Sequence, residues 1–170
     1  MAKLVDTIDQ AIGAMSDREG KYLTFALAGE EYGISILKIK EIIGMMPITT
    51  IPQTPEFVKG VINLRGKVIP VVDLRLRFGM QKFDYTERTC IVVVDISGGA
   101  GTVMIGTVVD SVSEVLNIKG ADIEETPAFG TKLETDYILG MAKFQDGVKI
   151  LLDIDRVLSG NDIAVLEKAA

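Results

Sequence analysis

The sequence predicts an all-β protein of two similar small barrels, because short β-branched runs dominate it and their pattern occurs twice. Apolar runs of three to seven residues alternate with Gly, Pro and Asp. The 17 glycines among 170 residues fit tight turns between short strands. Several runs are apolar at successive positions, as in strands that are buried on both faces. The expected strands are residues 22–28, 32–34, 61–64, 68–72, 91–96, 103–109 and 148–152.

The repeat has two blocks in the same order in both halves of the chain. In the first block Gly33 aligns with Gly106, at an offset of 73 residues. In the second block Phe57 aligns with Tyr137, at an offset of 80 residues. Chance matches are easy in a Val-rich chain, but shared order and spacing favour a true repeat. We therefore expect two similar barrels, each too small to be very stable alone, that share a core.

The two barrels are expected to occupy residues 19–160 as intertwined subdomains, with a short helix at each end of the chain. Residues 1–18 have apolar side chains at helical spacing, which predicts an amphipathic helix that packs on the domain rather than a membrane anchor. At the other end, Asn161 and Asp162 are potential caps of a helix over residues 161–170.

Composition argues against several classes of function. The formal net charge is -6, whereas nucleic-acid binding needs clustered cationic charge. The chain has no histidine and a single cysteine, Cys90, which excludes His-based catalysis, His-ligated metals and multi-Cys clusters. No apolar stretch approaches the roughly 20 residues of a membrane span. We expect a cytoplasmic binding protein that is not an enzyme and has no cofactor.

The repeat is broken at one turn, and this turn is the first candidate site. The first half has Asn63-Leu64-Arg65-Gly66 where the second has KFQD at residues 143–146. Turn conformation explains Asn and Gly but does not call for Arg65. Its planar guanidinium suits carboxylates, carbonyls or aromatic faces of a partner. A solvated turn arginine or a local salt bridge is the alternative.

Residues 34–43 are the second candidate, because they hold more apolar side chains than one buried strand face can use. Part of the segment could face outward as a contact patch beside Lys38 and Glu41; alternatively, all its isoleucines belong to the core. Met45 and Met46 follow where the strand ends, as an adaptable contact surface or as plain packing. The isoleucines in question are Ile36, Ile39 and Ile42.

Asp73 and Asp153 occur at matching places in the two halves, each at the end of a strand. Both precede expected helical turns, residues 74–78 and 154–158. Repetition in both halves favours a capping role over a catalytic one. Glu124-Glu125 gives only the weakest hint of a carboxylate-based hydrolase.

Four segments of the chain match the pattern of a known family. They are EYGIxILKxxEI at residues 31–42, TPxFxKGVxNLRG at 54–66, IPVVDLR at 69–75 and GxVVDxVxEVL at 106–116. Together they resemble the CheW family, the chemotaxis coupling proteins of bacteria and archaea. The resemblance covers nearly all of residues 20–160 and is most specific at the Asn-Leu-Arg-Gly turn.

The resemblance implies two five-stranded SH3-like barrels packed together, forming an adaptor without catalysis or cofactor. Its implied partners are the cytoplasmic tips of methyl-accepting chemoreceptors and the regulatory domain of the histidine kinase CheA. Alone it would be a monomer, and it would work within larger receptor arrays at the membrane. The implied receptor-binding groove, between the barrels, contains Ile39, Glu41, Gly60, Asn63, Arg65, Gly66, Cys90 and Val92. For the kinase contact we name Met45, Met46, Ile48 and Thr49.

Two departures from the family pattern matter. Residues 97–102 form a longer stretch than the usual hairpin, and no receiver domain follows, which favours the stand-alone coupling protein over fused relatives. The alternatives are a CheW-like scaffold of another two-component pathway and a small-ligand-sensing barrel. A sensing barrel would need a closed apolar pocket rather than a broad groove.

Overall fold

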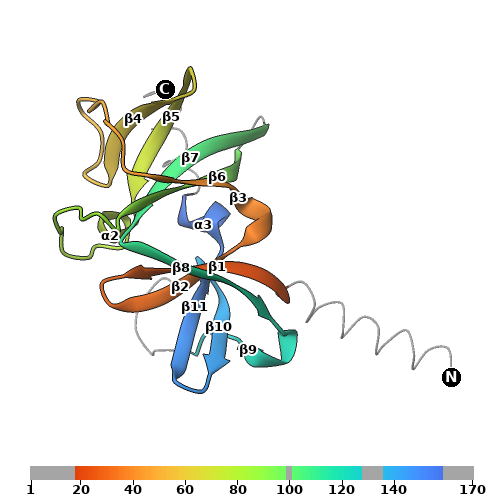
Figure 1. Ribbon diagram of the computed structural model, residues 1–170. Coiled ribbons are helices and arrows are strands. Elements are labelled where there is room, and N and C mark those ends of the chain that lie inside the picture. The colour runs from red at the N-terminus through yellow and green to blue at the C-terminus, as the bar shows by residue number, and fades with distance from the viewer. Residues whose placement is uncertain (1–17, 99–100, 128–135, 159–170) are drawn as a thin grey trace, which may run out of the picture.

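The computed structural model describes residues 18–98, 101–127 and 136–158, and it contains two β-sheets that form two SH3-like barrels (Figure 1). The predicted all-β, two-barrel fold is confirmed. Apart from Arg18, the helices expected over residues 1–18 and 161–170 lie outside the described residues. No helix in the described part of the chain has the length and apolar character that a membrane span requires.

One barrel is built from a single stretch of chain, and we call it the contiguous barrel. Its sheet has the order β3-β6-β7-β5-β4. Thr49, in the segment after β3, forms an antiparallel bridge with Val61 of β4, so the two edge strands are joined. The bounds are β3 Ile39–Gly44, β4 Val58–Leu64, β5 Lys67–Asp73, β6 Cys90–Gly98 and β7 Gly101–Val109.

The other barrel combines strands from both ends of the described chain, and we call it the split barrel. Its sheet has the order β8-β1-β2-β11-β10-β9. A 3-10 turn, η2 (Gly120–Asp122), connects β8 to the two-residue strand β9. The bounds are β1 Gly20–Leu27, β2 Glu30–Ser35, β8 Ser111–Ile118, β9 Ile123–Glu124, β10 Ile138–Phe144 and β11 Gly147–Leu152.

The chain crosses between the barrels twice, first at η1 (Ile36–Lys38) and then at Asp110. Residues 34–43, expected as one strand, are therefore two strands separated by this first crossing. Each sequence repeat places its first hairpin in one barrel and its later strands in the other. Parallel pairs, β2 with β11 and β5 with β7, hold the exchanged hairpins in place.

Both parallel pairs contain a glycine, Gly33 and Gly106, at a position where neighbouring strands leave no room for a side chain. A Cβ at Gly33 would lie 2.9 Å from a methyl of Leu151, and one at Gly106 would lie 2.8 Å from a methyl of Ile91. This close approach explains why the two glycines align in the repeat.

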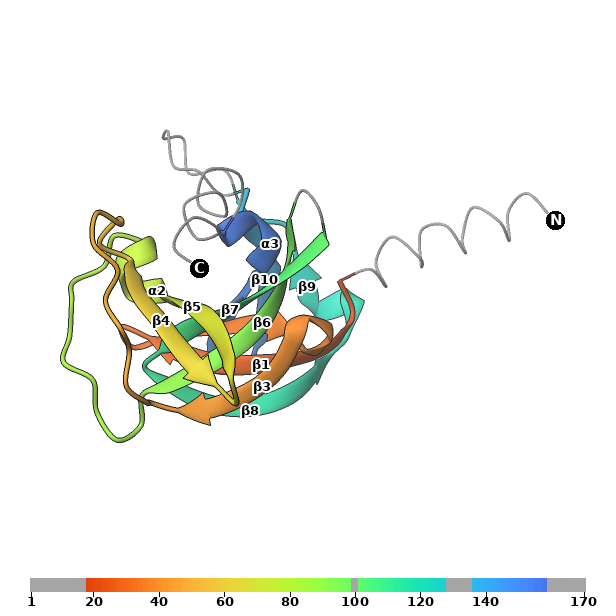
Figure 2. The ribbon, with the colours of Figure 1, turned by 90° about the horizontal axis from the view of Figure 1, so that it is seen from above.

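The largest hydrophobic cluster lies between the barrels, as the repeat predicted. It joins Phe25 and Ile34 of the split barrel to Val92 and Val94 of the contiguous barrel. Each fully buried side chain of this size contributes roughly 1.5–3 kcal/mol. Smaller clusters fill the two barrel interiors. The helices α2 (Leu74–Arg77) and α3 (Ile154–Val157) lie apart from one another along the contact (Figure 2).

The predicted caps have different outcomes in the two halves. Asp73 occupies the N-cap of α2 and its carboxylate accepts a 3.3 Å hydrogen bond from the Leu76 N–H, so this prediction is confirmed. Asp153 occupies the same position before α3, but its side chain makes no cap bond. Its carboxylate lies 3.5 Å from the Arg156 guanidinium instead, so capping by Asp153 was wrong.

Candidate protein-binding site

The β4–β5 turn holds Arg65 in a backbone conformation that suits glycine better. Arg65 has φ 52° and Gly66 has φ 85°, as in the tight turns that join twisted antiparallel strands. Asn63 Oδ1 accepts a 2.8 Å hydrogen bond from the Gly66 N–H and closes the turn. A left-handed conformation costs energy for an arginine. The turn itself therefore gives no reason for this side chain.

The Arg65 guanidinium pairs with the Glu41 carboxylate of β3, so the local salt bridge considered above is present. The hydrogen bond with Glu41, and then its charge, raise the pKa of Arg65. The Arg65 side chain is 70% exposed and that of Glu41 is 31% exposed. Since a guanidinium has five N–H donors, Arg65 can hold Glu41 and still bind a partner.

The remaining predicted receptor residues differ in burial. Ile39 and Cys90 are half-buried and pack against the cluster between the barrels. Val92 belongs to that cluster and is 0% exposed. The pairing of β3 with β6 places these residues on neighbouring strands with Glu41. Of these residues and their neighbours, Arg65 is the most exposed, Glu41, Ile39 and Cys90 are partly exposed, and Val92 is inaccessible.

Gly60 is buried and has a structural role. Its φ is +138°, and a Cβ would lie 2.0 Å from the Thr49 carbonyl oxygen. The glycine lets the chain after β3 pass close over β4 and form the Thr49–Val61 bridge. Gly60 thus affects the candidate site through the backbone path of the neighbouring chain and not through a side chain.

The segment named for kinase contact is largely packed. Met45, Met46 and Ile48 are half-buried against the interior cluster of the contiguous barrel. Thr49 is exposed, and its backbone exchanges hydrogen bonds of 2.8 and 2.9 Å with Val61. Packing in the barrel therefore accounts for the buried part of these three side chains, and only their exposed part could contact a partner.

The two barrels carry grooves at equivalent places with opposite charge. The groove of the contiguous barrel has a volume of about 410 Å³ and is lined by Lys40, Lys67 and Asp95, beside Val68. The groove of the split barrel has a volume of about 230 Å³ and is mainly acidic. The charged residues that line it are Glu30, Glu31, Asp146 and Lys149.

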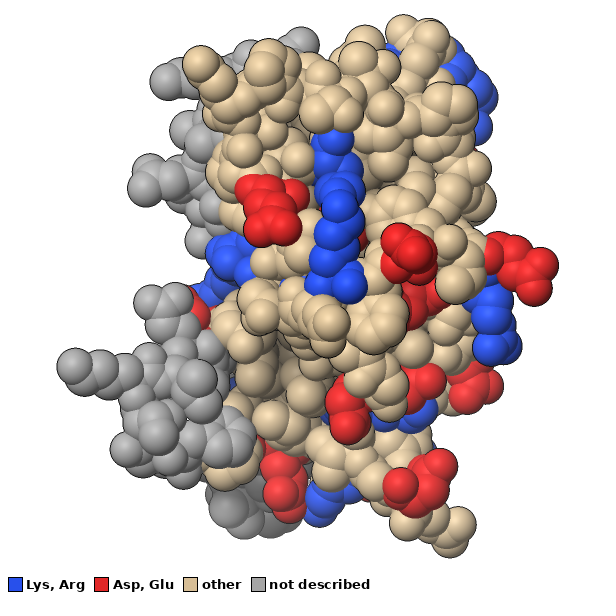
Figure 3. All heavy atoms as spheres, turned by 90° about the vertical axis from the view of Figure 1, so that its left-hand side faces the viewer, with Lys and Arg blue, Asp and Glu red and all other residues tan. Residues whose placement is uncertain are grey.

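Exposed apolar side chains also repeat between the barrels. Ile42 of β3 aligns with Val115 of β8, and Val68 of β5 aligns with Val148 of β11. All four are about half exposed. On the face that carries α2, Lys and Arg side chains form a central column between Asp and Glu side chains (Figure 3).

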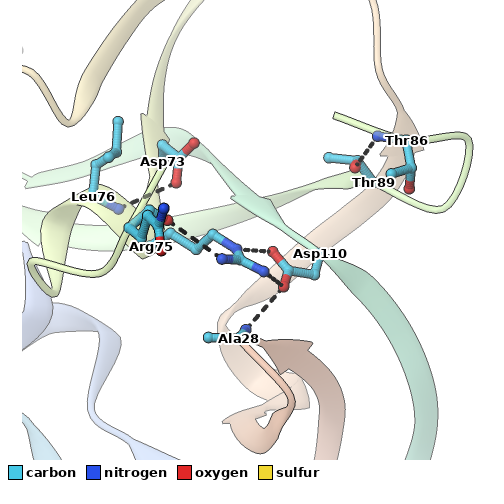
Figure 4. A network of polar contacts seen from close by, with 8 residues as sticks. Ala28, Asp73, Arg75, Leu76, Thr86, Thr89 and Asp110 are labelled. Atoms are coloured by element: carbon cyan, nitrogen blue, oxygen red, sulfur yellow. Dashed lines mark hydrogen bonds and ion pairs between the residues drawn. The ribbon is translucent and has the colours of Figure 1, made fainter. Parts of the chain in front are cut away.

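The second crossing is fixed by a polar network that sequence reasoning missed. Asp110 lies between the Arg75 guanidinium and the Ala28 N–H and accepts hydrogen bonds from both (Figure 4). The distances are 2.6 Å from Arg75 Nε to Asp110 Oδ1 and 2.9 Å from Ala28 N to Asp110 Oδ2. The bond to Asp110 raises the pKa of Arg75. Both charged residues stood in quoted motifs, but nothing in the sequence marks them as partners.

Beside this network, Tyr85 donates a 2.8 Å hydrogen bond to Asp73 Oδ2. Burial, and then this bond, raise the pKa of Tyr85. The Arg75 guanidinium also lies 4.2 Å from the centre of the Phe83 ring. These contacts hold the chain between α2 and β6 around a small hollow of about 130 Å³. No group of three or more Cys, Asp or Glu in the described residues is arranged to hold a metal.

Comparison with known proteins gives a consistent result. A family profile described as the CheW-like domain matches residues 21–162. The chain is 38% identical over 164 residues to the chemotaxis protein CheW of Klebsiella aerogenes, covering 96% of this chain and 95% of that protein. It is 32% identical to the CheW of Thermotoga maritima, over 83% of this chain and 89% of that protein.

A solved structure has the same fold. The crystal structure of the scaffolding protein TtCheW from Thermoanaerobacter tengcongensis superposes with a TM-score of 0.74 at 38% identity. The match covers 85% of this chain and 95% of that chain.

Proposed function

The chain belongs to the CheW family of chemotaxis scaffold and adaptor proteins, and we propose that it couples chemoreceptors to the kinase CheA by binding both. It does this as a non-catalytic protein in the cytoplasm, at receptor arrays. The observation that carries the proposal is Arg65, an exposed arginine in a turn conformation that disfavours it, already paired with Glu41.

The receptor site lies where β3, the start of β6 and the β4–β5 turn meet. Ile39 and Cys90 offer apolar surface, and Arg65 with Glu41 forms the polar rim. A helical receptor tip fits this arrangement, because an amphipathic helix buries one apolar face and leaves polar groups at the edge. Asn63 and Gly66 hold the turn in shape, and the buried Gly60 and Val92 support the strands beneath.

The kinase contact is proposed at the barrel faces. The family resemblance implies that the kinase's regulatory domain has a similar two-barrel fold, so barrel can pack against barrel. Equivalent grooves of opposite charge, one basic and one acidic, support this arrangement because they select orientation as well as partner. Met45, Met46, Ile48 and Thr49 remain the proposed kinase residues on the contiguous barrel.

Signal transfer needs no chemistry in this chain. A receptor that changes shape would shift the β3 surface, and the shift would reach the kinase through packed barrels. Modest affinity at each face suffices, because repeated contacts in an array raise the effective concentration of every partner.

The test measures binding of the full chain to a receptor cytoplasmic fragment and, separately, to the kinase regulatory domain. Arg65→Ala should weaken the receptor interaction about tenfold, because charge-assisted hydrogen bonds at the rim are lost. Gln145→Ala is the matched control, since Gln145 holds the equivalent position in the split barrel. It should bind both partners like the wild type.

Circular dichroism must show that both variants remain folded. If the wild-type chain binds neither partner, coupling is the wrong function. A scaffold of another pathway or a small-ligand sensor would then have to be tested. Equal losses in Arg65→Ala and Gln145→Ala would remove the receptor site from the β4–β5 turn.

A further inference from the structure

An ion pair at the first crossing ties the start of β3 to the helix that follows the split barrel. Lys38 Nζ, at the end of η1, lies 2.6 Å from Asp155 Oδ2 of α3. Asp155 Oδ1 also accepts a 2.9 Å hydrogen bond from the Ser97 N–H of β6. Ile154 and Val157, on either side in α3, are buried between the barrels. The carboxylate is therefore fixed by a helix that cannot move without repacking the shared core.

All three charged side chains from Lys38 to Glu41 are paired, each with a different element. Lys38 pairs with α3, Lys40 pairs with Asp95 of β6 at 3.1 Å, and Glu41 pairs with Arg65 of the β4–β5 turn. The second and third partners belong to the contiguous barrel. Of these three pairs, Lys38–Asp155 is the one that connects the segment before β3 to the helix that follows the split barrel. It therefore helps to fix the position of β3 relative to that barrel.

The second crossing has an equivalent clamp with the charges reversed. Arg75 and Asp155 are both the second residue of the helix that follows a hairpin, α2 in one half and α3 in the other. At the first crossing the helix supplies the anion and the crossing segment supplies Lys38. At the second crossing the helix supplies the cation and the crossing supplies Asp110.

The reversed clamps share a further detail. In each of them the carboxylate also accepts a 2.9 Å hydrogen bond from a backbone N–H. Asp155 accepts it from Ser97 in the β6–β7 hairpin, and Asp110 accepts it from Ala28 in the β1–β2 hairpin. They differ in what they adjoin. Lys38 directly precedes Ile39, whereas Asp110 leads into β8. Leu37, the residue before Lys38 in the first clamp, is apolar and 91% exposed.

We propose that Lys38 and Asp155 are positioning residues of the receptor site. They set Leu37, Ile39 and Glu41 at a fixed place relative to the split barrel, so that the surface is in its binding shape before the receptor arrives. The Arg75–Asp110 clamp does the same structural work at a crossing that the receptor does not touch. The inference rests on the proposed function, because it concerns the same receptor.

Two isosteric variants separate the clamps. Asp155→Asn removes the charge opposite Lys38 but keeps an oxygen for the Ser97 N–H, and Asp110→Asn does the same for Ala28. Asp155→Asn should weaken binding of the receptor fragment about two- to fivefold, the range that partly exposed ion pairs give. Asp110→Asn should lower the melting temperature and leave receptor affinity unchanged. Neither should alter binding of the kinase domain.

Three further measurements exclude a general loss of stability as the cause. Lys38→Arg keeps the cation and should bind the receptor fragment like the wild type, whereas Lys38→Met should match Asp155→Asn. At about 1 M salt the difference between wild type and Asp155→Asn should become smaller, because the Debye length falls to about 3 Å, close to the length of this partly buried pair. Hydrogen exchange at the β3 amides should quicken more in Asp155→Asn than in Asp110→Asn, because only the first clamp adjoins β3.

The outcomes distinguish this inference from the function it rests on. A wild-type chain that does not bind the receptor fragment overturns both. Receptor binding that is normal in Asp155→Asn, or reduced equally in Asp110→Asn, overturns the positioning role and leaves the proposed function standing.

Discussion

The contiguous and split barrels share one strand arrangement, and they differ in the turn of the hairpin that follows the shared glycine. Both have a shift in strand register at the same glycine, Gly60 in one and Gly140 in the other. The backbone N–H of Asp73 donates to Phe57 and that of Asp153 donates to Tyr137, both at 2.8 Å. The scaffold positions are therefore shared.

Their hairpin turns are not shared. The contiguous barrel turns through Arg65 and Gly66, both at positive φ, whereas the equivalent Gln145 and Asp146 are not among the residues with positive φ. Lys143, beside that turn, pairs with Glu124 of its own barrel at 2.8 Å. The comparison teaches that the two halves keep their packing positions and differ in the chemistry of an exposed turn.

Replacing the paired glycines tests how deep this likeness goes, and it should give the largest effect. Gly60→Ala should cost about 3 kcal/mol or more, because the new methyl would meet backbone at 2.0 Å and the φ is strained. At Gly140 the nearest atom is a side-chain methyl of Ile123 at 2.6 Å. Glu124 O lies at 3.1 Å, but no backbone atom is as close as at Gly60 and Gly140 is not at positive φ, so Gly140→Ala should cost less, about 1–2 kcal/mol.

Urea unfolding of both glycine variants measures these costs. Equal losses of stability would mean that the bulge is equally rigid in the two barrels, against the difference in their contacts.

The two aspartates after the hairpins should show the next largest contrast. Asp73→Ala leaves the Leu76 N–H and the Tyr85 hydroxyl without their acceptor and should destabilise the fold by about 2 kcal/mol. Asp153→Ala removes only an exposed pairing with Arg156 and should cost under about 0.5 kcal/mol. Thermal unfolding of the two variants checks this, and similar losses would contradict the asymmetry of the caps.

The smallest contrast is between two pH ranges, and it concerns Tyr85 of the contiguous barrel. The pKa of Tyr85 lies above its ordinary value of 10 in the folded chain, so the unfolded chain loses this proton first. The stability that the Tyr85–Asp73 bond contributes is complete below pH 10 and declines as the pH rises above it. Tyr85→Phe should therefore lower stability by about 1 kcal/mol at pH 7.

The gap between wild type and Tyr85→Phe should close from pH 10 upward. Taking the difference between the wild type and Tyr85→Phe cancels the contribution that the other tyrosines make to stability at alkaline pH. A gap that stays constant to high pH would show that the phenol–carboxylate bond is not what Tyr85 contributes.

Much of the fold could be predicted because it depends on local patterns. Alternating turn residues and β-branched runs predicted the strands, and the aligned glycines predicted two barrels. Residues 34–43 were misread as one strand, because nothing in an apolar run marks the point where the chain leaves one barrel for another. The predicted capping role of Asp153 was wrong because its carboxylate lies beside Arg156 instead of the helix N–H groups.

The candidate site was predicted in part. Arg65 was identified because it breaks the repeat, and its pairing with Glu41 was left open. The partners of Lys38 and Asp110 could not be predicted, since ion pairs between distant segments depend on how hairpins are exchanged. A comparison of charges at repeated positions, Arg75 against Asp155, was the available signal.

The exchange of hairpins sets an order in time. Every strand of the contiguous barrel has been made once the ribosome has passed Val109. The hairpin of β1 and β2, although made first, pairs with β11, where Gly33 meets Leu151. It must stay unpaired on that edge until more than a hundred further residues have been synthesised, and long-range pairing of this kind is slow. The contiguous barrel is then complete and exposes its half of the shared core. The first and last strands of the chain can assemble against that surface.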